Sequence, residues 1–259
     1  MNAAQAAVLG AVQGLAEFLP ISSSAHLALA PRLLGWPDQG LAFDVALHMG
    51  TLAALLACFW RDWWALAYDG LRRADTDSRR LFDAMALGTV PAGLAGLALA
   101  DYAETVFRDP ARIAVTLAAF GVLMGWADLK GRKERAVSAA GLRDVLLIGC
   151  AQALALVPGV SRSGITMTAA LLLGFDRVAS ARISFLLAVP ITAAAGLHEL
   201  PKALPYAGEP AFWVGIGVSG LVGMAAIKGL LKLLGGRGLM PFAVYRVAFG
   251  AFLLFLGRG

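Results

Sequence analysis

The sequence has few charged residues and almost no cysteine. Of its 259 residues, 15% are Asp, Glu, Lys or Arg and only two are Cys, whereas 59% are hydrophobic. A soluble domain averages about 25% charged and 45–50% apolar residues, so this composition excludes an ordinary soluble fold. Cys58 and Cys150 stand alone in apolar segments. They are too few and too isolated for a disulfide framework or a zinc site.

Several other signals are missing from the sequence. No Walker-type phosphate loop is present, so the sequence gives no sign of ATP-driven chemistry. The first residues lack the basic region of a secretory signal peptide, and the alternation of a β-barrel strand is absent. The net charge of +5 comes from short loops, which fits acidic lipid head groups rather than nucleic acid. We therefore expect one all-α, polytopic membrane domain over residues 1–259.

Six apolar stretches are long enough to cross a bilayer as single helices. Each has roughly 17–23 residues, and they cover residues 41–60, 82–100, 111–127, 179–200, 211–233 and 240–257. Two further regions, 3–34 and 143–174, are broken in the middle by Pro- and Ser-rich segments. Non-helical backbone at membrane depth is tolerated only where protein or a wet cavity surrounds it. Each broken region is therefore expected to be a re-entrant helical hairpin.

The two broken regions form an internal repeat at an offset of 139 residues. The matched positions are Gly10 with Gly149, Gln13 with Gln152, Leu15-Ala16 with Leu154-Ala155, Ser22 with Ser161, and Ser24 with Ser163. Paired broken helices in two halves of a membrane protein point to a binding site at the midplane. We expect the two halves, about 1–127 and 140–259, to be related by an inverted-topology repeat.

Basic residues gather in three of the connections between the spans. They are Arg61, Arg72, Arg73, Arg79 and Arg80; Lys130, Arg132, Lys133, Arg135 and Arg143; and Lys228, Lys232 and Arg237. The positive-inside rule assigns these connections to the cytoplasm. Both termini are then expected outside, and the two hairpins enter from opposite faces. The segment 72–83 is expected to be a solvated cytoplasmic loop.

Polar side chains are concentrated at the first break. Gln13 and Glu17 share one helix face. An ionised carboxylate at this depth costs roughly 2.5–3.5 kcal/mol, so Glu17 needs a cation or a proton as its partner. A helix N-cap needs one hydroxyl, but here three serines precede the second half-helix and a histidine follows in its first turn. These residues are Ser22, Ser23, Ser24 and His26.

The second break contributes an arginine between two serines. Arg162 carries a planar fork that matches phosphate oxygens, and a helix N-terminus is expected to point at each break. Gly159 and Gly164 permit close backbone approach. Together with Ser161 and Ser163, these groups predict an anion site. A hydroxyl, an imidazole, a carboxylate and an arginine suit phosphoryl transfer, and the buried position suggests a lipid-linked phosphate.

Other residues of the apolar segments are expected to have structural or interfacial roles. The polar ones are Asp44, His48, Arg182 and Arg246. Ala6, Gly10 and Gly14 form a stripe of small residues, which predicts close helix packing.

The two broken segments resemble the signature segments of the undecaprenyl-diphosphatase family, the bacterial bacitracin-resistance membrane phosphatases. The resemblance rests on Gln13-x-x-x-Glu17, Pro20-x-Ser22-Ser23-Ser24-x-His26 and Pro158-Gly159-x-Ser161-Arg162-Ser163-Gly164, and it extends to Phe43-Asp44, Phe59-Trp60-Arg61 and Ala181-Arg182-x-Ser184-Phe185-Leu186-Leu187. The family accepts Glu or Gln at its first motif position. Thr is common where this chain has Ser24, which keeps the hydroxyl.

This resemblance implies hydrolysis of undecaprenyl diphosphate to undecaprenyl phosphate and inorganic phosphate, which recycles the lipid carrier for peptidoglycan synthesis. It implies a divalent cation, Mg²⁺ or Ca²⁺, and a multi-pass protein of the bacterial inner (plasma) membrane whose site faces the periplasm. The expected partners are the lipid substrate and the bilayer, with no nucleic acid. The oligomeric state, a homodimer included, is left open.

Our mechanistic hypothesis assigns a role to each candidate. Arg162, the helix N-termini and a cation near Glu17 bind the diphosphate, surrounded by the expected substrate-binding residues Gln13, Ser22, Ser24, Ser161, Ser163, Gly159 and Gly164. Ser23 attacks the terminal phosphorus, and His26 or Glu17 takes the hydroxyl proton. Attack by His26 and direct attack by water stay open. The alternative of another class is a lipid-phosphate flippase or secondary transporter, because transporters share this inverted-repeat architecture.

Overall fold

The computed structural model of the chain describes residues 1–73, 75–99 and 109–256. Every regular element in these ranges is a helix, and the isolated β-bridge found there joins Arg135 to Phe175. The all-α class expected from the sequence is therefore confirmed. Residues 100 and 257, the last residues of two expected spans, lie outside the described ranges, and so does the C-terminus.

Four helices are long and apolar enough to cross a membrane. They are α5 (Asp77–Ala98), α7 (Pro110–Lys130), α10 (Arg177–Ala203) with the short η4 (Leu204–Gly208), and α11 (Pro210–Leu234). These correspond to four of the six expected spans. α3 (Gly40–Cys58) passes the same test only together with the next helix, from which it is bent by 81°, and α12 (Met240–Leu256) is an apolar helix of 17 residues. The described residues thus hold four or five candidate spans of a multi-pass membrane protein.

The connection after α3 differs from the expected loop. Residues Trp60–Leu71 form helix α4, and α5 already begins at Asp77, with the Thr76 hydroxyl accepting the Arg79 amide at 3.2 Å. The expectation of a solvated loop over 72–83 is therefore wrong for residues 77–83. Charges of both signs there suggested a loop, but Arg79 and Asp83 pair at 3.4 Å along the exposed face of the helix.

Each broken region forms a pair of helices, with the break where it was expected, while re-entry into a membrane stays a prediction. The first pair is α1 (Ala3–Phe18) and α2 (Ser23–Leu34); the second is α8 (Leu142–Ala153) with the short η3 (Leu154–Leu156), and α9 (Arg162–Leu172), while η2 (Val137–Ala139) precedes α8. Ser22 and Ser161, which correspond in the repeat, have φ angles of 76° and 71°. Such angles are rare in residues other than glycine and cost about 1–3 kcal/mol each. The same strained turn is therefore built at both breaks.

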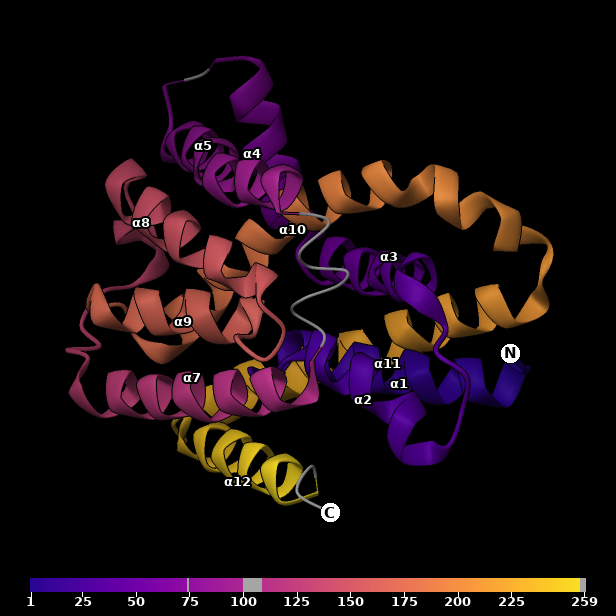
Figure 1. Ribbon diagram of the computed structural model, residues 1–259. Helices are drawn as coiled ribbons and strands as arrows, with labels where there is room; N and C mark the ends of the chain where they lie inside the picture. The colour runs from indigo at the N-terminus through magenta and orange to yellow at the C-terminus, as the bar shows by residue number, and fades with distance from the viewer. Residues whose placement is uncertain (74, 100–108, 257–259) are drawn as a thin grey trace.

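Close helix packing holds the first broken pair in place. α1 lies along α11, and α12 lies along α7 (Figure 1). A Cβ added at Gly10 would lie 2.5 Å from the carbonyl oxygen of Gly215, and one added at Gly14 would lie 2.6 Å from that of Ser219. The small-residue stripe predicted from the sequence is confirmed as the surface that contacts α11.

A large cluster of buried apolar residues includes the end of α1, next to the first break. It joins Phe18, the last residue of α1, to residues of α9 and α10. The rings of Phe18 and Phe185 meet edge to face with centroids 5.5 Å apart. Because Phe18 is fully buried, this contact fixes the end of α1, where Glu17 stands.

The buried carboxylate of Asp128, near the C-terminal end of α7, links this helix to the starts of α10 and α12. Asp128 accepts a hydrogen bond from Nε of Arg177 at 2.6 Å, at the start of α10. It also accepts the backbone N–H of Leu239 at 2.9 Å, just before α12. The Asp128 side chain is 2% exposed, so these partners replace water around its charge.

Candidate active site

A cavity of about 760 Å³ lies beside both breaks. Its polar wall includes Glu17 and Ser23 from the first broken pair and Arg162 from the second. Apolar side chains of α3, α5 and α10 form much of the rest: Val45, Val90, Leu94, Leu97 and Ile191. A cavity with one polar region and long apolar walls suits a ligand that joins a charged head group to an apolar chain.

Glu17 is the centre of the polar region. Its Oε1 accepts a hydrogen bond from Nη2 of Arg162 at 2.7 Å. Its Oε2 accepts the Ser23 hydroxyl at 2.6 Å and the Gln13 amide at 3.1 Å. The Glu17 residue is 6% exposed, so this charge is removed from water and compensated by named partners. The structure therefore brings together four residues that the sequence singled out.

Arg162 reaches Glu17 because it is the first residue of α9. Its Nη1 also donates to the carbonyl oxygen of Ser184 at 3.2 Å, which fixes the guanidinium plane. The α9 N-terminus is capped by Ser161, whose hydroxyl accepts the Gly164 amide at 3.1 Å. Ser161 and Ser24 both line the cavity, as their prediction as substrate-binding residues requires.

His48, for which a structural or interfacial role was expected, lies at the site. Its Nε2 lies 3.4 Å from Oε2 of Glu17, and its Nδ1 lies 2.7 Å from the Asp44 carbonyl oxygen. His48 also lines the cavity. The signal that could have revealed it is the ionisable pair Asp44 and His48 on one face of an apolar helix, because an ionisable residue inside a membrane is a functional candidate by default.

The His26 ring forms no hydrogen bond with the Ser23 hydroxyl. Its Nδ1 lies 2.7 Å from the Ser22 carbonyl oxygen and its Nε2 lies 2.7 Å from the hydroxyl of Tyr245. Its ring stacks on Phe249 with centroids 5.1 Å apart. Both ring nitrogens are thus engaged away from the cavity, and the acceptor of the Ser23 hydrogen bond is Glu17. A direct catalytic role for His26 stays a prediction.

Other predicted substrate-binding residues join the two breaks to each other. The Ser22 hydroxyl accepts the Gly159 amide at 3.1 Å and lies 3.2 Å from the Ser24 hydroxyl. Ser163 donates to the carbonyl oxygen of Leu19 at 3.4 Å. Gly159 has a φ of 94°, and a Cβ there would lie 2.7 Å from the Ile113 carbonyl oxygen. In this structure Gly159 packs closely against α7, and its role in substrate binding stays a prediction.

Arg246, on α12, forms hydrogen bonds with the backbone of both breaks. It is fully buried, and its Nη2 donates to the carbonyl oxygens of Gly159 and Val160 at 2.8 Å each. Weaker hydrogen bonds reach the carbonyl oxygens of Leu117 at 3.3 Å and Pro20 at 3.4 Å. A Cβ at Gly164 would lie 2.6 Å from Arg246 Nη1, so this glycine makes room for the arginine. The structural role expected for Arg246 agrees with these contacts.

The described residues offer few ligands for the expected divalent cation. Among the described residues, no group of three or more His, Cys, Asp or Glu side chains is placed to hold a metal ion. Both oxygens of Glu17 already accept hydrogen bonds. Mg²⁺ often binds through one or two carboxylates plus phosphate oxygens of the substrate. Glu17 therefore fits a cation only when the substrate supplies most of its ligands.

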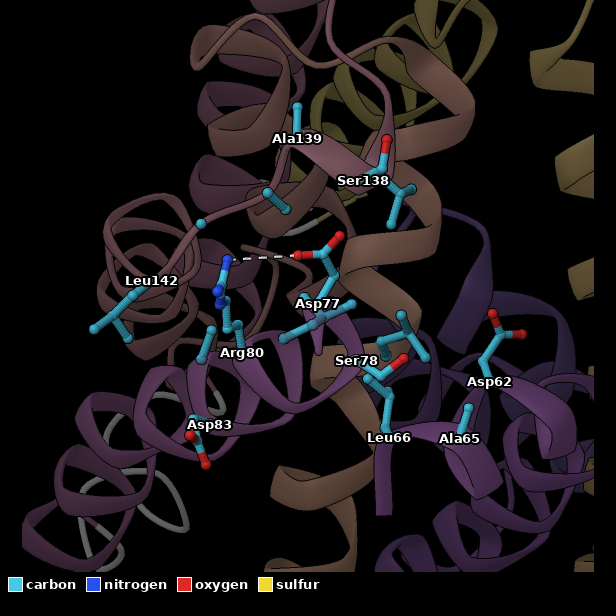
Figure 2. A pocket seen from close by; sticks show the side chains of 16 residues that line it. Asp62, Ala65, Leu66, Asp77, Ser78, Arg80, Asp83, Ser138, Ala139 and Leu142 are labelled. Carbon is cyan, nitrogen blue, oxygen red and sulfur yellow. Dashed lines mark ion pairs between the residues drawn. The ribbon is translucent and has the colours of Figure 1, made fainter. Parts of the chain in front are cut away.

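A second cavity, of about 650 Å³, lies between α4, α5 and residues 137–142. Figure 2 shows its side chains, including the ion pair of Arg80 and Asp77, in which Nη1 of Arg80 lies 3.7 Å from Oδ1 of Asp77. None of the predicted site residues lines it. The cavity beside the breaks is therefore the candidate active site.

Comparisons with known proteins agree over almost the whole chain. Residues 6–252 match the family described as bacitracin resistance protein BacA. A protein of Pelotomaculum thermopropionicum named undecaprenyl-diphosphatase is 47% identical, over 99% of this chain and 97% of its own length. The protein of that name from Moorella thermoacetica is 46% identical, over 98% and 97%. Undecaprenyl-diphosphatase 2 of Stutzerimonas stutzeri is 47% identical over the full length of both.

Proposed function

This chain belongs to the bacitracin resistance protein BacA family, and on that basis we propose that its activity is that of an undecaprenyl-diphosphatase. It is a membrane-embedded hydrolase that converts undecaprenyl diphosphate to undecaprenyl phosphate and inorganic phosphate. The observation that carries this conclusion is the match to relatives of that name over nearly the full length of both chains. The activity recycles the lipid carrier of cell-wall synthesis and underlies bacitracin resistance.

We further propose that the cavity beside the breaks is the active site. Ser23, Glu17 and Arg162 supply a hydroxyl, its hydrogen-bond acceptor and a cation within one set of contacts of 2.6–2.7 Å. A phosphoryl group has to displace Arg162 from Glu17 or share it, and both arrangements pair the guanidinium with phosphate oxygens. The apolar walls of α3, α5 and α10 accept the first isoprene units of the lipid.

In the proposed mechanism, the Ser23 oxygen attacks the terminal phosphorus while Glu17 takes the hydroxyl proton. An O–P bond forms to Ser23, the bridging P–O bond breaks, and undecaprenyl phosphate leaves with the bridging oxygen. Water then attacks the phosphoserine, inorganic phosphate departs, and the proton returns to Ser23. The 2.6 Å hydrogen bond from Ser23 to Glu17 is the geometry that general-base catalysis requires. Nucleophilic attack by His26 and direct attack by water are the competing versions.

A divalent cation, Mg²⁺ or Ca²⁺, is part of the proposal. Glu17 and the diphosphate oxygens would hold it, and it would neutralise charge on the phosphoryl group. Arg162, held by Ser184 and Glu17, remains the chain's own counter-charge for the head group.

We also propose the membrane arrangement expected from the sequence. Six spans and two re-entrant hairpins, related by an inverted repeat, set both termini and the site on the periplasmic side of the bacterial inner membrane. The same strained turn at Ser22 and Ser161 supports the repeat, and the positive-inside rule supports the orientation. A mass measurement in detergent distinguishes a monomer from a homodimer.

Release of inorganic phosphate by the purified protein in detergent tests the function. No transbilayer gradient exists there, so a carrier or flippase would release none, whereas the proposed hydrolase turns over undecaprenyl diphosphate. A chelator should abolish the release and added Mg²⁺ or Ca²⁺ should restore it. Full activity in the presence of chelator would contradict the requirement for a divalent cation. Absence of phosphate release under all conditions would contradict the proposed function.

A further inference from the structure

Gln152 on α8 is a buried amide without a protein partner. It is 2% exposed and lines the cavity beside the breaks. Neither its Oε1 nor its Nε2 has a hydrogen-bond partner among the described residues. A buried polar group left unpaired costs about 1–3 kcal/mol, and most buried polar groups in folded proteins are paired. An unpaired amide on a cavity wall therefore calls for a ligand.

The internal repeat explains why this amide is unpaired. Gln152 corresponds to Gln13 at the offset of 139 residues. In the first half, the Gln13 amide donates to Glu17, one helical turn further on, at 3.1 Å. The residue that corresponds to Glu17 in the second half is Leu156. The second half therefore keeps the amide but lacks the carboxylate that would bind it.

The surroundings of Gln152 indicate which part of a lipid diphosphate it meets. Arg162 and Ser23 are held around Glu17, and in the proposed mechanism they take the terminal phosphoryl group. Gln152 comes from a different helix, and the cavity-lining residues that follow it, Ala155 and Leu156, are apolar. An amide N–H donates to a phosphate oxygen without adding charge. We propose that Gln152 is a substrate-binding residue that donates to the phosphoryl group attached to the lipid chain.

This inference rests on the proposed function and assigns the two phosphoryl groups of the substrate to different residues. It is tested with the two reaction products as competitive inhibitors of the purified enzyme. Undecaprenyl phosphate carries the lipid-attached phosphoryl group, and inorganic phosphate represents the terminal one. In Gln152→Leu, the inhibition constant of undecaprenyl phosphate should rise about tenfold, as expected for one hydrogen bond to a charged group. That of inorganic phosphate should stay within about twofold.

Two further variants make the test decisive. Gln152→Glu keeps the size of the side chain and adds a negative charge, so it should raise the inhibition constant of undecaprenyl phosphate more than Gln152→Leu does. It also serves if the leucine variant fails to fold. Gln5→Leu carries the same substitution at the N-terminus of α1, in the capping box with Asn2, and should leave both constants unchanged.

The inference is wrong if both inhibition constants stay at their wild-type values in the Gln152 variants, or if both rise by the same factor. An equal rise would point to a general disturbance of the cavity. If the wild-type enzyme itself releases no phosphate, the proposed function fails. If the wild-type enzyme is active but the Gln152 variants keep the wild-type inhibition constants, only the assignment of Gln152 is wrong.

Discussion

The hydroxyl of Ser23 lies 2.6 Å from Oε2 of Glu17, across the break between α1 and α2. This contact brings the proposed nucleophile and the proposed proton acceptor together at the end of a helix whose position is fixed by packing against α11. Arg162 from the second break occupies the other oxygen of the same carboxylate. The proposed chemistry therefore depends on both breaks at once.

Replacing Glu17 tests which group accepts the Ser23 proton. Glu17→Gln keeps the shape of the side chain but removes the base, so phosphate release should fall by about 10²–10⁴-fold. Phosphate release should fall less in His26→Gln, because the His26 ring nitrogens contact Ser22 and Tyr245. The reverse order would make His26 the base. Glu209→Gln, at an exposed position before α11, is the matched control and should keep full activity.

The fork of Arg162 is expected to matter as much as its charge. Arg162→Lys keeps one positive charge but cannot bind Ser184 and Glu17 together, so kcat/KM should fall by about 10²-fold. Arg182→Lys is the control, since Arg182 pairs with Asp62 at 2.7 Å and the two side chains are 37% and 36% exposed. A lysine can replace an arginine in such a partly exposed ion pair at little cost. A lysine at position 162 with near-normal kcat/KM would show that the planar fork is dispensable.

His48 should support Glu17 without replacing it. In His48→Ala the contact of 3.4 Å to Glu17 is lost, and phosphate release should fall about tenfold, which corresponds to about 1.4 kcal/mol. A loss as large as that of Glu17→Gln would instead make His48 the base. Unchanged activity would remove His48 from the site.

The breaks and the order of the long apolar helices could be predicted from the sequence, whereas α4 was missed and the contacts around Glu17 could only partly be predicted. Pro20 and Pro158 interrupt apolar helices with residues that favour turns, which is a local signal. The pair of Gln13 and Glu17 follows from helical spacing. The contact of His48 with Glu17 joins residues on different helices, and neither spacing nor composition encodes it.

Two other features were hidden for different physical reasons. α4 mixes tryptophans with Arg61, Asp62 and Asp69. These charges suggested part of the charged connection between two spans, yet such an amphipathic pattern is typical of a helix at a membrane surface. Arg246 satisfies its charge with four backbone carbonyl oxygens. Backbone acceptors leave no trace in the sequence, so the link between α12 and the two breaks could not be predicted.

The buried carboxylate of Asp128 should contribute to stability but not to catalysis. Asp128→Ala leaves Arg177 and the Leu239 amide without their acceptor, so the free energy of unfolding in detergent should fall by about 2 kcal/mol. This is less than for a fully buried pair, because the Arg177 side chain is 32% exposed. Asp75→Ala breaks an exposed pair with Arg80 and should cause no measurable change. Equal stability of the two variants would contradict the role of Asp128.

Phosphate release by Ser23→Ala is the measurement that tests the central claim most directly. The claim is that Ser23, activated by Glu17, carries the phosphoryl group between the lipid and water. The account predicts that the purified, folded variant loses at least about 10³-fold in rate, while Ser24→Ala, which keeps the Ser23–Glu17 contact, is much less affected. Near-normal phosphate release by Ser23→Ala would contradict the account and would favour His26 or water as the nucleophile.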